Sequence, residues 1–246
     1  MKLPTVKSLT SDYLFGIPLV DEDGNEYPKS NIESWIARAV GWCETQLQIK
    51  IAPTTIKLES HDYHIDEYQS FCYIQLYQYP VISVESLMAT YAGVEIMSFP
   101  QDWIQIYKES GQLQLVPTTG SLSQVLMGQG SGMLLPLITG RLSNMPHLFK
   151  VSYTAGFEDG SIPANIFDLI SMKACMGILN IMGDILLGAG IASQSLSIDG
   201  LSESITTTQS AENSAYSARI RQYEREIKAQ LPELKAFYKG LRLGVA

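Results

Sequence analysis

The three histidines are the first residues that suggest chemistry, because an imidazole can both carry a proton and bind a metal. His61 and His64 occur in the stretch HDYH, and His147 is isolated from both. A zinc site needs ligands that converge on one point, whereas an i, i+3 pair in a strand or turn splays apart. We therefore predict a polar edge strand here and no metal site.

Three other stretches resemble binding loops only in part. GQGSG (128–132) and GAG (188–190) lack the strand-turn-helix context and the Lys-Ser/Thr ending of phosphate-binding loops. DEDGNE (21–26) lacks the ligand alternation and the closing Glu of a calcium loop, so a solvated turn is favoured. No GxSxG nucleophile motif is present. We predict no catalytic residue, no cofactor and no metal, and hence a protein that is not an enzyme.

Charge and cysteine content restrict the function further. Cys43, Cys72 and Cys175 are too few and too scattered for a disulfide framework, and they are expected to be small buried residues in a reducing compartment. The net charge of −8 disfavours general affinity for nucleic acid. Residues 219–246 nevertheless carry seven Lys or Arg and three Asp or Glu, whereas residues 1–218 carry 10 basic and 22 acidic residues. A basic end thus follows an acidic body.

Apolar residues at three-and-four spacing predict three helices. The first follows a Ser30 to Glu33 capping box and is closed by Pro53. The second starts after Pro163 and is apolar on nearly every side, so it needs partners on more than one face. Asn180 and Asp184 within it argue against a membrane span. The third starts near residue 211, and Pro232 is expected to stop or kink it.

A β-rich stretch and a polar strip lie between these helices. Short β-branched and aromatic runs from Ile56 to about Thr154 predict a small antiparallel sheet, sandwich or barrel. The strip from Gln194 to Ala218 has no Lys or Arg, and its Asp199-Gly200 pair allows either a small hairpin or a solvated loop.

The predicted fold class is α+β, a helical bundle of long helices with an inserted antiparallel β domain and an extended C-terminal tail. The expected divisions are an N-terminal arm and first helix (1–55), the β-rich domain (56–157), the rest of the helical domain (158–231, with 191–210 as hairpin or loop), and a C-terminal docking tail (232–246).

Two segments resemble the head-tail connector (adaptor, or head-completion) proteins of tailed bacteriophages. The first is the arm YLFGIPLVDEDG with the helix SNIESWIARAVGWCETQLQIKIAP that follows it. The second, VSYTAGFEDGSIPANIFDLISMKACMGIL, is a strand ending in Tyr-x-Ala-Gly, a short loop, an Ile-Pro helix start and a long apolar helix. The strand YPVISVESL also fits this type. Compact members lack so long a stretch between the two segments, so a larger β domain is inserted here.

The resemblance implies a structural virion protein in the neck, assembled in the host cytoplasm. Such adaptors form a twelve-fold ring under the portal protein, extend the channel for double-stranded DNA without binding it specifically, and receive the next neck or tail protein. It implies no membrane partner. The candidates for portal docking are Leu234, Lys235, Phe237, Tyr238, Lys239, Leu241 and Arg242. The candidates for lining the channel, chosen because carboxylates repel phosphate, are Asp199, Glu203 and Glu212.

Two other classes of function remain open at this point. The chain could be another phage component, such as a tail terminator or baseplate subunit, which would share the β domain but would not need an apolar helix. It could also be a soluble ligand-binding protein or enzyme that uses a cleft of the β domain. The mass of the purified protein separates a ring from a compact monomer.

Overall fold

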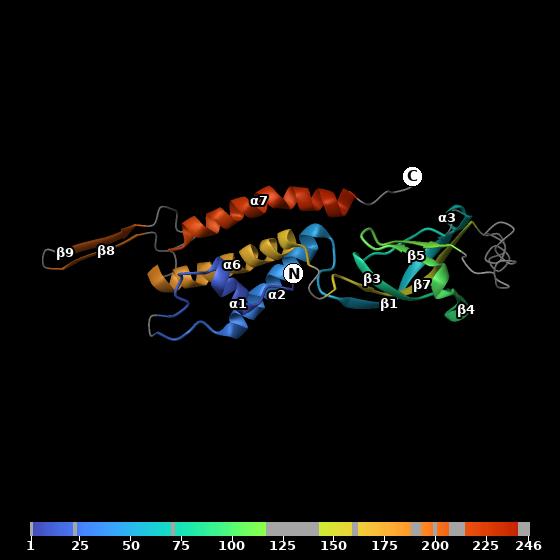
Figure 1. The fold of residues 1–246 in the computed structure, drawn as a ribbon, viewed down its shortest axis with the longest axis horizontal. Helices are drawn as coiled ribbons and strands as arrows, with labels where there is room; N and C mark the ends of the chain where they lie inside the picture. The colour runs from blue at the N-terminus through green and yellow to red at the C-terminus, as the bar shows by residue number, and fades with distance from the viewer. Residues whose placement is uncertain are drawn as a thin grey trace. The chain divides into compact units, whose positions relative to one another are not determined.

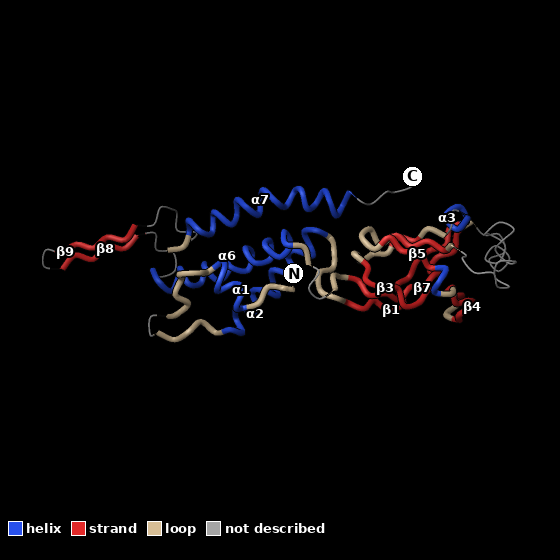
Figure 2. The backbone as a smooth tube through the Cα atoms, in the orientation of Figure 1, coloured by secondary structure: helices blue, strands red, loops and turns tan. Residues whose placement is uncertain are grey.

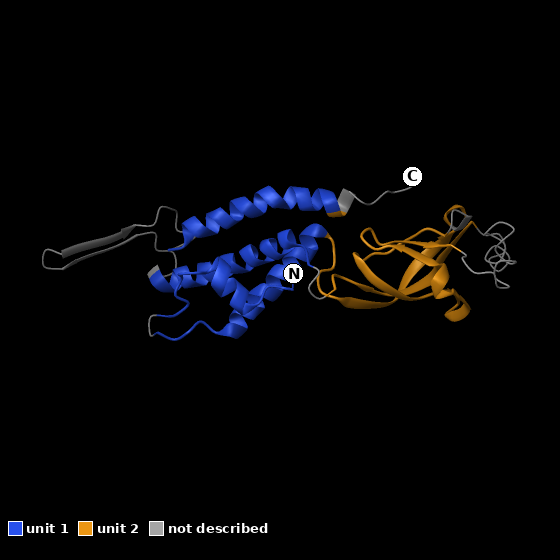
Figure 3. Cartoon of the chain, in the orientation of Figure 1, with its two compact units in different colours: residues 1–47, 159–237 blue, residues 48–158, 238–246 orange. Residues whose placement is uncertain are grey.

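The computed structural model describes residues 2–21, 24–69, 72–116, 143–158, 162–187, 193–198, 201–206 and 215–240. Helices and antiparallel sheets are both present, as the predicted α+β class requires (Figures 1 and 2). The chain divides into two compact units (Figure 3). Unit 1 comprises residues 1–47 and 159–237, and unit 2 comprises residues 48–158 and 238–246.

Helix α2 (Lys29–Leu47) begins one residue before the cap that we predicted. The backbone N–H groups of Asn31 and Ile32 donate to the carbonyl of Pro28, which places Ser30 inside the first turn. The expected end at Pro53 is also too late, because Gln48 has a φ of 58° and ends the helix in the left-handed region. The buried face follows the predicted spacing: Ile32, Ile36, Ala39, Cys43 and Leu47.

Helix α6 (Ala164–Leu187) is the core helix of unit 1. It packs against α2 and against the short π-helix η1 (Leu9–Tyr13), which follows helix α1 (Val6–Ser8). By length and composition alone α6 could cross a membrane, but more than half of its apolar window is buried inside the protein. Asn180 and Asp184 lie on its exposed side. This burial is what a core helix of a globular unit shows.

Helix α7 (Ser217–Gly240) corrects the prediction for the C-terminal end. We expected Pro232 to stop or kink the helix; it lies inside α7, so the stop is wrong, and residues 232–240 continue the helix. A proline removes one backbone hydrogen bond, yet the apolar stripe continues on both sides of it at three-and-four spacing. Ile220, Tyr223 and Ile227 are buried before Pro232, and Leu234 and Tyr238 after it. Continued burial of the stripe offsets the missing hydrogen bond.

Unit 2 contains two antiparallel sheets around one hydrophobic core. The first has the order β1 (Thr54–His64), β7 (Asn144–Ala155), β3 (Val81–Tyr91) and β4 (Val94–Ser98). The second has the order β2 (Ile74–Gln75), β6 (Gln112–Leu115) and β5 (Ile104–Tyr107). Helix α3 (Ile65–Gln69) and the 3-10 turn η2 (Gln101–Trp103) connect strands. Of the shapes that the sequence allowed, this arrangement is a two-sheet sandwich.

The end of β7 explains the Tyr-x-Ala-Gly motif. Gly156 has a φ of 124°, and a side chain there would place its Cβ 2.7 Å from the carbonyl oxygen of Ala52. The N–H of Gly156 donates to the carbonyl of Pro80, and the N–H of Phe157 donates to the carbonyl of Ile51. Glycine is needed here because three backbone segments of unit 2 approach closely.

The polar strip contains a hairpin of β8 (Ser193–Ile198) and β9 (Leu201–Thr206). Two kinds of residue pair alternate along the hairpin. Ser193, Ser195 and Ser197 stand opposite Thr206, Ser204 and Ser202, whereas Gln194, Leu196 and Ile198 stand opposite Ile205, Glu203 and Leu201. The alternation in the sequence therefore reflects strand pairing.

Candidate functional site

A hydrogen-bonded cluster, which we name the Tyr13 network, joins the start of unit 1 to its two long C-terminal helices. The hydroxyl of Tyr13 donates to Asp168 of α6 at 2.6 Å. The hydroxyl of Tyr223 on α7 donates to the carbonyl of Tyr13 at 2.7 Å, and the two rings meet edge to face at 6.4 Å. Arg219 donates at 3.4 Å both to the same carbonyl and to the Tyr223 hydroxyl. Three distant segments are thus tied at η1.

The Tyr13 hydroxyl remains protonated and can donate its hydrogen bond to the Asp168 carboxylate. Burial raises the pKa of Tyr13, and the hydrogen bond to the Asp168 carboxylate raises it further. Burial also raises the pKa of the nearby Cys175 thiol to about 12. Both groups therefore stay protonated at neutral pH, and a buried thiol of this kind is a poor nucleophile. The Tyr13 network therefore joins η1, α6 and α7 through hydrogen bonds of neutral hydroxyl groups.

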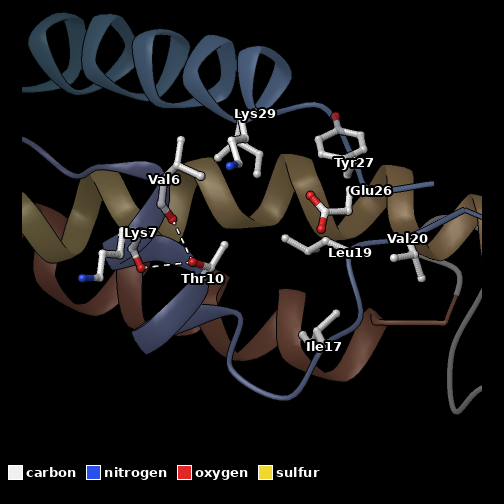
Figure 4. Close-up of a pocket in the computed structure, with 10 residues that line it drawn as sticks. Val6, Lys7, Thr10, Ile17, Leu19, Val20, Glu26, Tyr27 and Lys29 are labelled. Atoms are coloured by element: carbon white, nitrogen blue, oxygen red, sulfur yellow. Dashed lines mark hydrogen bonds between the residues drawn. The ribbon is translucent and has the colours of Figure 1, made fainter. Parts of the chain in front are cut away.

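Unit 1 also contains an open groove of about 560 Å³, which we name the N-terminal groove (Figure 4). It is formed by α1, the arm that follows η1, and the start of α2. Its walls are mainly apolar: Val6, Ile17, Leu19, Val20, Tyr27 and Ile32. Its polar lining is Lys7, Thr10, Glu26 and Lys29, and the hydroxyl of Thr10 is bonded to the carbonyls of Val6 and Lys7. An apolar wall with few charges suits a docked side chain more than a polar metabolite.

The acidic loop DEDGNE forms one edge of the arm. Asp21 accepts hydrogen bonds from the backbone N–H and the side-chain amide of Asn25, and Val20 pairs with Glu26 in a β-bridge. Residues 22 and 23 lie outside the described residues. The part that is described is a turn closed by its own carboxylate.

The candidates for portal docking divide into three groups. Leu234 and Tyr238 are 5% and 7% exposed, so their packing in the fold leaves them little surface for a partner. Lys235 donates to Gln46 of α2 at 2.7 Å, whereas Phe237 is 56% exposed. The backbone of Lys239 belongs to α7, and Leu241 and Arg242 lie outside the described residues. Sequence reasoning missed the burial because it ended the helix at Pro232.

The channel-lining candidates lie in and around the hairpin. Glu203 belongs to β9, where it pairs with Leu196 of β8. Asp199, between the two strands, and Glu212 lie outside the described residues.

Unit 2 contains a second polar cluster, the Glu59 network, that the sequence did not reveal. The carboxylate of Glu59 is bonded by the ring of His61 at 2.8 Å, the N–H of Tyr77 at 3.0 Å and the hydroxyl of Tyr153 at 2.7 Å. Its side chain is only 7% exposed. A β-bulge lies beside Glu59 and interrupts the alternation of side chains between the two faces of the sheet. The burial of Glu59 therefore does not follow from its position in the strand.

Hydrogen bonding determines the ionisation of Glu59. Burial acts to raise the pKa of the carboxyl, but the bonds from His61, Tyr153 and the Tyr77 N–H outweigh it and lower the pKa below its usual range. The shallow hollow beside this cluster, about 210 Å³, includes His61, His64 and Glu67. Within the described ranges, no group of three or more His, Cys, Asp or Glu residues is placed to hold a metal ion. His61 and His64 both line this hollow, and His61 bonds to Glu59.

Comparison with known proteins gives a limited result. No family model and no curated protein matches the chain. Among solved structures, the chain is similar to part of the neck of an empty gene transfer agent (GTA) particle computed with C6 symmetry, with 14% identity over 70% of this chain and 81% of that chain at a TM-score of 0.34.

Two further structures belong to native particles of the same kind. The neck computed with C12 symmetry gives 10% identity over 79% of this chain and 82% of that chain, with a TM-score of 0.36. The virion of the native particle gives 13% identity over 89% of this chain and 91% of that chain, with a TM-score of 0.38. Values this low assign no fold and no role to the chain.

Proposed function

We propose that the chain is a structural protein of a phage-like neck, a head-tail connector whose copies form a ring of about twelve subunits under a portal protein. The ring extends the DNA channel and receives the next neck or tail protein. The proposal places the protein in the virion and gives it no enzymatic activity and no cofactor. Unit 1 is the connector body, built on long helices, and unit 2 is an inserted β domain.

The packing of α2 against α6 is the observation that carries this proposal. These helices are the two segments in which the chain resembles connector proteins, and more than 100 residues separate them in the sequence. In unit 1 they are in direct contact, with Gly177 of α6 against the Trp35 ring of α2. A resemblance carried by two distant segments gains support when those segments form one packed unit.

The proposed docking and channel surfaces keep those candidates that the structure does not bury. For portal docking we retain Phe237, together with the basic end at Lys239, Leu241 and Arg242. For the channel we retain the acidic residues of the polar strip, because a wall of carboxylates repels the phosphates of passing DNA. Neither surface uses the buried residues Leu234 and Tyr238.

Particle assembly without the protein tests the neck role. If the gene is deleted from the phage-like element that encodes it, we expect heads and tails that remain separate, and the wild-type gene supplied in trans should restore joined particles. A chain tagged at its C-terminus should appear at the head-tail junction in electron micrographs. Joined, infectious particles without the protein would contradict the proposal. Turnover of a small molecule by a compact monomer would instead support a soluble enzyme.

A shorter deletion tests portal docking. Removing residues 241–246 leaves all of α7 in place and should weaken capture of the chain by its portal protein. The matched control is Tyr107→Ser, which changes an exposed aromatic residue of unit 2. Equal capture of the truncated chain and the control chain would remove this end from the docking surface.

A further inference from the structure

Phe15 is the most exposed large apolar side chain among the described residues, at 79%. A single exposed apolar residue is common and needs no explanation by itself. Phe15, however, is held outward by an ordered turn. Leu14 is buried and its N–H donates to the carbonyl of Leu9, while the N–H of Ile17 donates back to the carbonyl of Leu14.

Gly16 makes this turn possible. Its φ of 78° is the left-handed conformation that favours glycine, and it follows Phe15 at the centre of the turn. Because Leu14 is fixed in the core and Ile17 belongs to the wall of the N-terminal groove, the ring of Phe15 is displayed on a short, closed segment. A side chain displayed in this way loses little conformational entropy when it binds.

The same unit that displays Phe15 contains a groove suited to an aromatic ring. The N-terminal groove has a volume of about 560 Å³ and mainly apolar walls, and Phe15 is not among the residues that line it. Aromatic residues placed in apolar pockets dominate many protein interfaces. Each copy of the chain therefore carries both a projection and a recess that its own projection does not fill.

Charge supports a second copy as the occupant. Asp12, exposed in η1 three residues before Phe15, would enter with the projection. Among the residues that line the groove, Lys7 and Lys29 outnumber the single carboxylate of Glu26. A negative charge beside the aromatic ring thus meets a positive rim, which favours this pairing over a basic partner.

We propose that the turn Leu14–Ile17 of one copy inserts Phe15 into the N-terminal groove of a second copy. Because Phe15 does not line the groove of its own copy, the contact can repeat from copy to copy and close into a ring. It would be the subunit contact of the proposed neck ring, and in that respect it rests on the proposed function.

Two variants and their mixture test the contact. Phe15→Ser removes the projection and keeps the groove, whereas Leu19→Arg blocks the groove and keeps the projection. Native mass spectrometry of the full chain should show oligomers for the wild type and mainly monomers for each variant alone, with association weakened about 30-fold or more. An equal mixture of the two variants should form mixed dimers, since one intact contact remains per pair.

The mixture also guards against a folding defect, because a misfolded variant would not restore association. Tyr91→Ser, at an aromatic residue of unit 2 that is 60% exposed, is the control that should keep the wild-type oligomer. A wild-type chain that stays monomeric at its highest soluble concentration would overturn the inference. So would Phe15→Ser oligomers of wild-type mass, or variants that fail to associate when mixed. Those results leave the neck role standing if imaging still finds the protein at the junction.

Discussion

The contact between α2 and α6 in unit 1 depends on the shapes of its side chains, whereas the Glu59 network of unit 2 depends on a buried charge. A Cβ added at Gly177 of α6 would lie 2.7 Å or less from three atoms of the Trp35 ring. The Tyr13 network adds hydrogen bonds to a half-buried Asp168. Unit 2 instead encloses the ionised carboxylate of Glu59 with three donors. The helix contact of unit 1 should therefore be sensitive to added volume, and the Glu59 network of unit 2 should be sensitive to the loss of a charge.

Removal of the Glu59 carboxylate should give the largest effect. Glu59→Ala leaves the Tyr153 hydroxyl, the Tyr77 N–H and the His61 ring without their acceptor, and a network of this kind should cost about 3 kcal/mol. Hydrogen exchange followed by mass spectrometry should show faster exchange in β1 and β7 and unchanged exchange in α2 and α6. The control Glu85→Ala removes an exposed carboxylate that accepts a bond from Thr154 in the same sheet, and it should change the free energy of unfolding by less than about 0.5 kcal/mol. Equal effects of the two variants would show that the Glu59 network stabilises unit 2 no more than the exposed bond of Glu85 does.

Added volume at the contact between α2 and α6 should give the second-largest loss of stability. Gly177→Ala forces the Trp35 ring to move, and overpacking of this kind should destabilise unit 1 by about 1 to 3 kcal/mol, less the gain in helix propensity. Gly41→Ala in α2 is the matched control, because a Cβ there meets no atom within 4 Å. It should stabilise the helix by up to about 1 kcal/mol. Thermal unfolding followed by tryptophan fluorescence measures the stability change of each variant. A loss of stability for Gly177→Ala and a gain for Gly41→Ala would support close packing at the helix contact.

The contrast also explains what the sequence could predict. Periodic apolar residues located α2, α6 and α7 because the face of a helix is determined by local spacing. Ile166, Leu169 and Ile170 of α6 follow this spacing and are buried. The three cysteines are buried as well, in line with their interpretation as small apolar residues. These features depend on short-range patterns.

The sites were less predictable, because they depend on contacts between distant segments. Glu59 occurs in an ordinary alternating strand, and only a β-bulge and the hydroxyl of Tyr153 make it a buried carboxylate. Pro232 carries a strong local signal for a helix end, yet the burial of Leu234 beyond it overrides that signal. The N-terminal groove has no motif at all, since it is formed by an arm, a short helix and the start of α2.

Loss of one hydroxyl in the Tyr13 network should give a smaller change. Tyr13→Phe keeps the ring against Tyr223 but removes the bond to Asp168, so unit 1 should lose about 1.5 kcal/mol. Urea unfolding with an unchanged m-value would report this loss as a change in stability alone. Tyr107→Phe, at an exposed tyrosine of unit 2, should leave the midpoint within error. A midpoint for Tyr13→Phe equal to that of the wild type would mean that Asp168 is as well bonded by water.

Lowering the pH should give the smallest difference in stability between the two units. Hydrogen bonds hold the pKa of Glu59 below the ordinary value of about 4.3, so the ionised carboxylate stabilises the folded state. This stabilisation is complete above the ordinary pKa and is lost as the pH falls through the lowered one. Between neutral pH and pH 3, the protection of the β1 amides against exchange, relative to that of the α6 amides in the same molecule, should therefore fall more in the wild type than in Glu59→Gln. Parallel pH profiles for the two proteins would show that the Glu59 carboxyl has the same pKa in the folded and the unfolded state. The charge of Glu59 would then contribute nothing to the stability of unit 2.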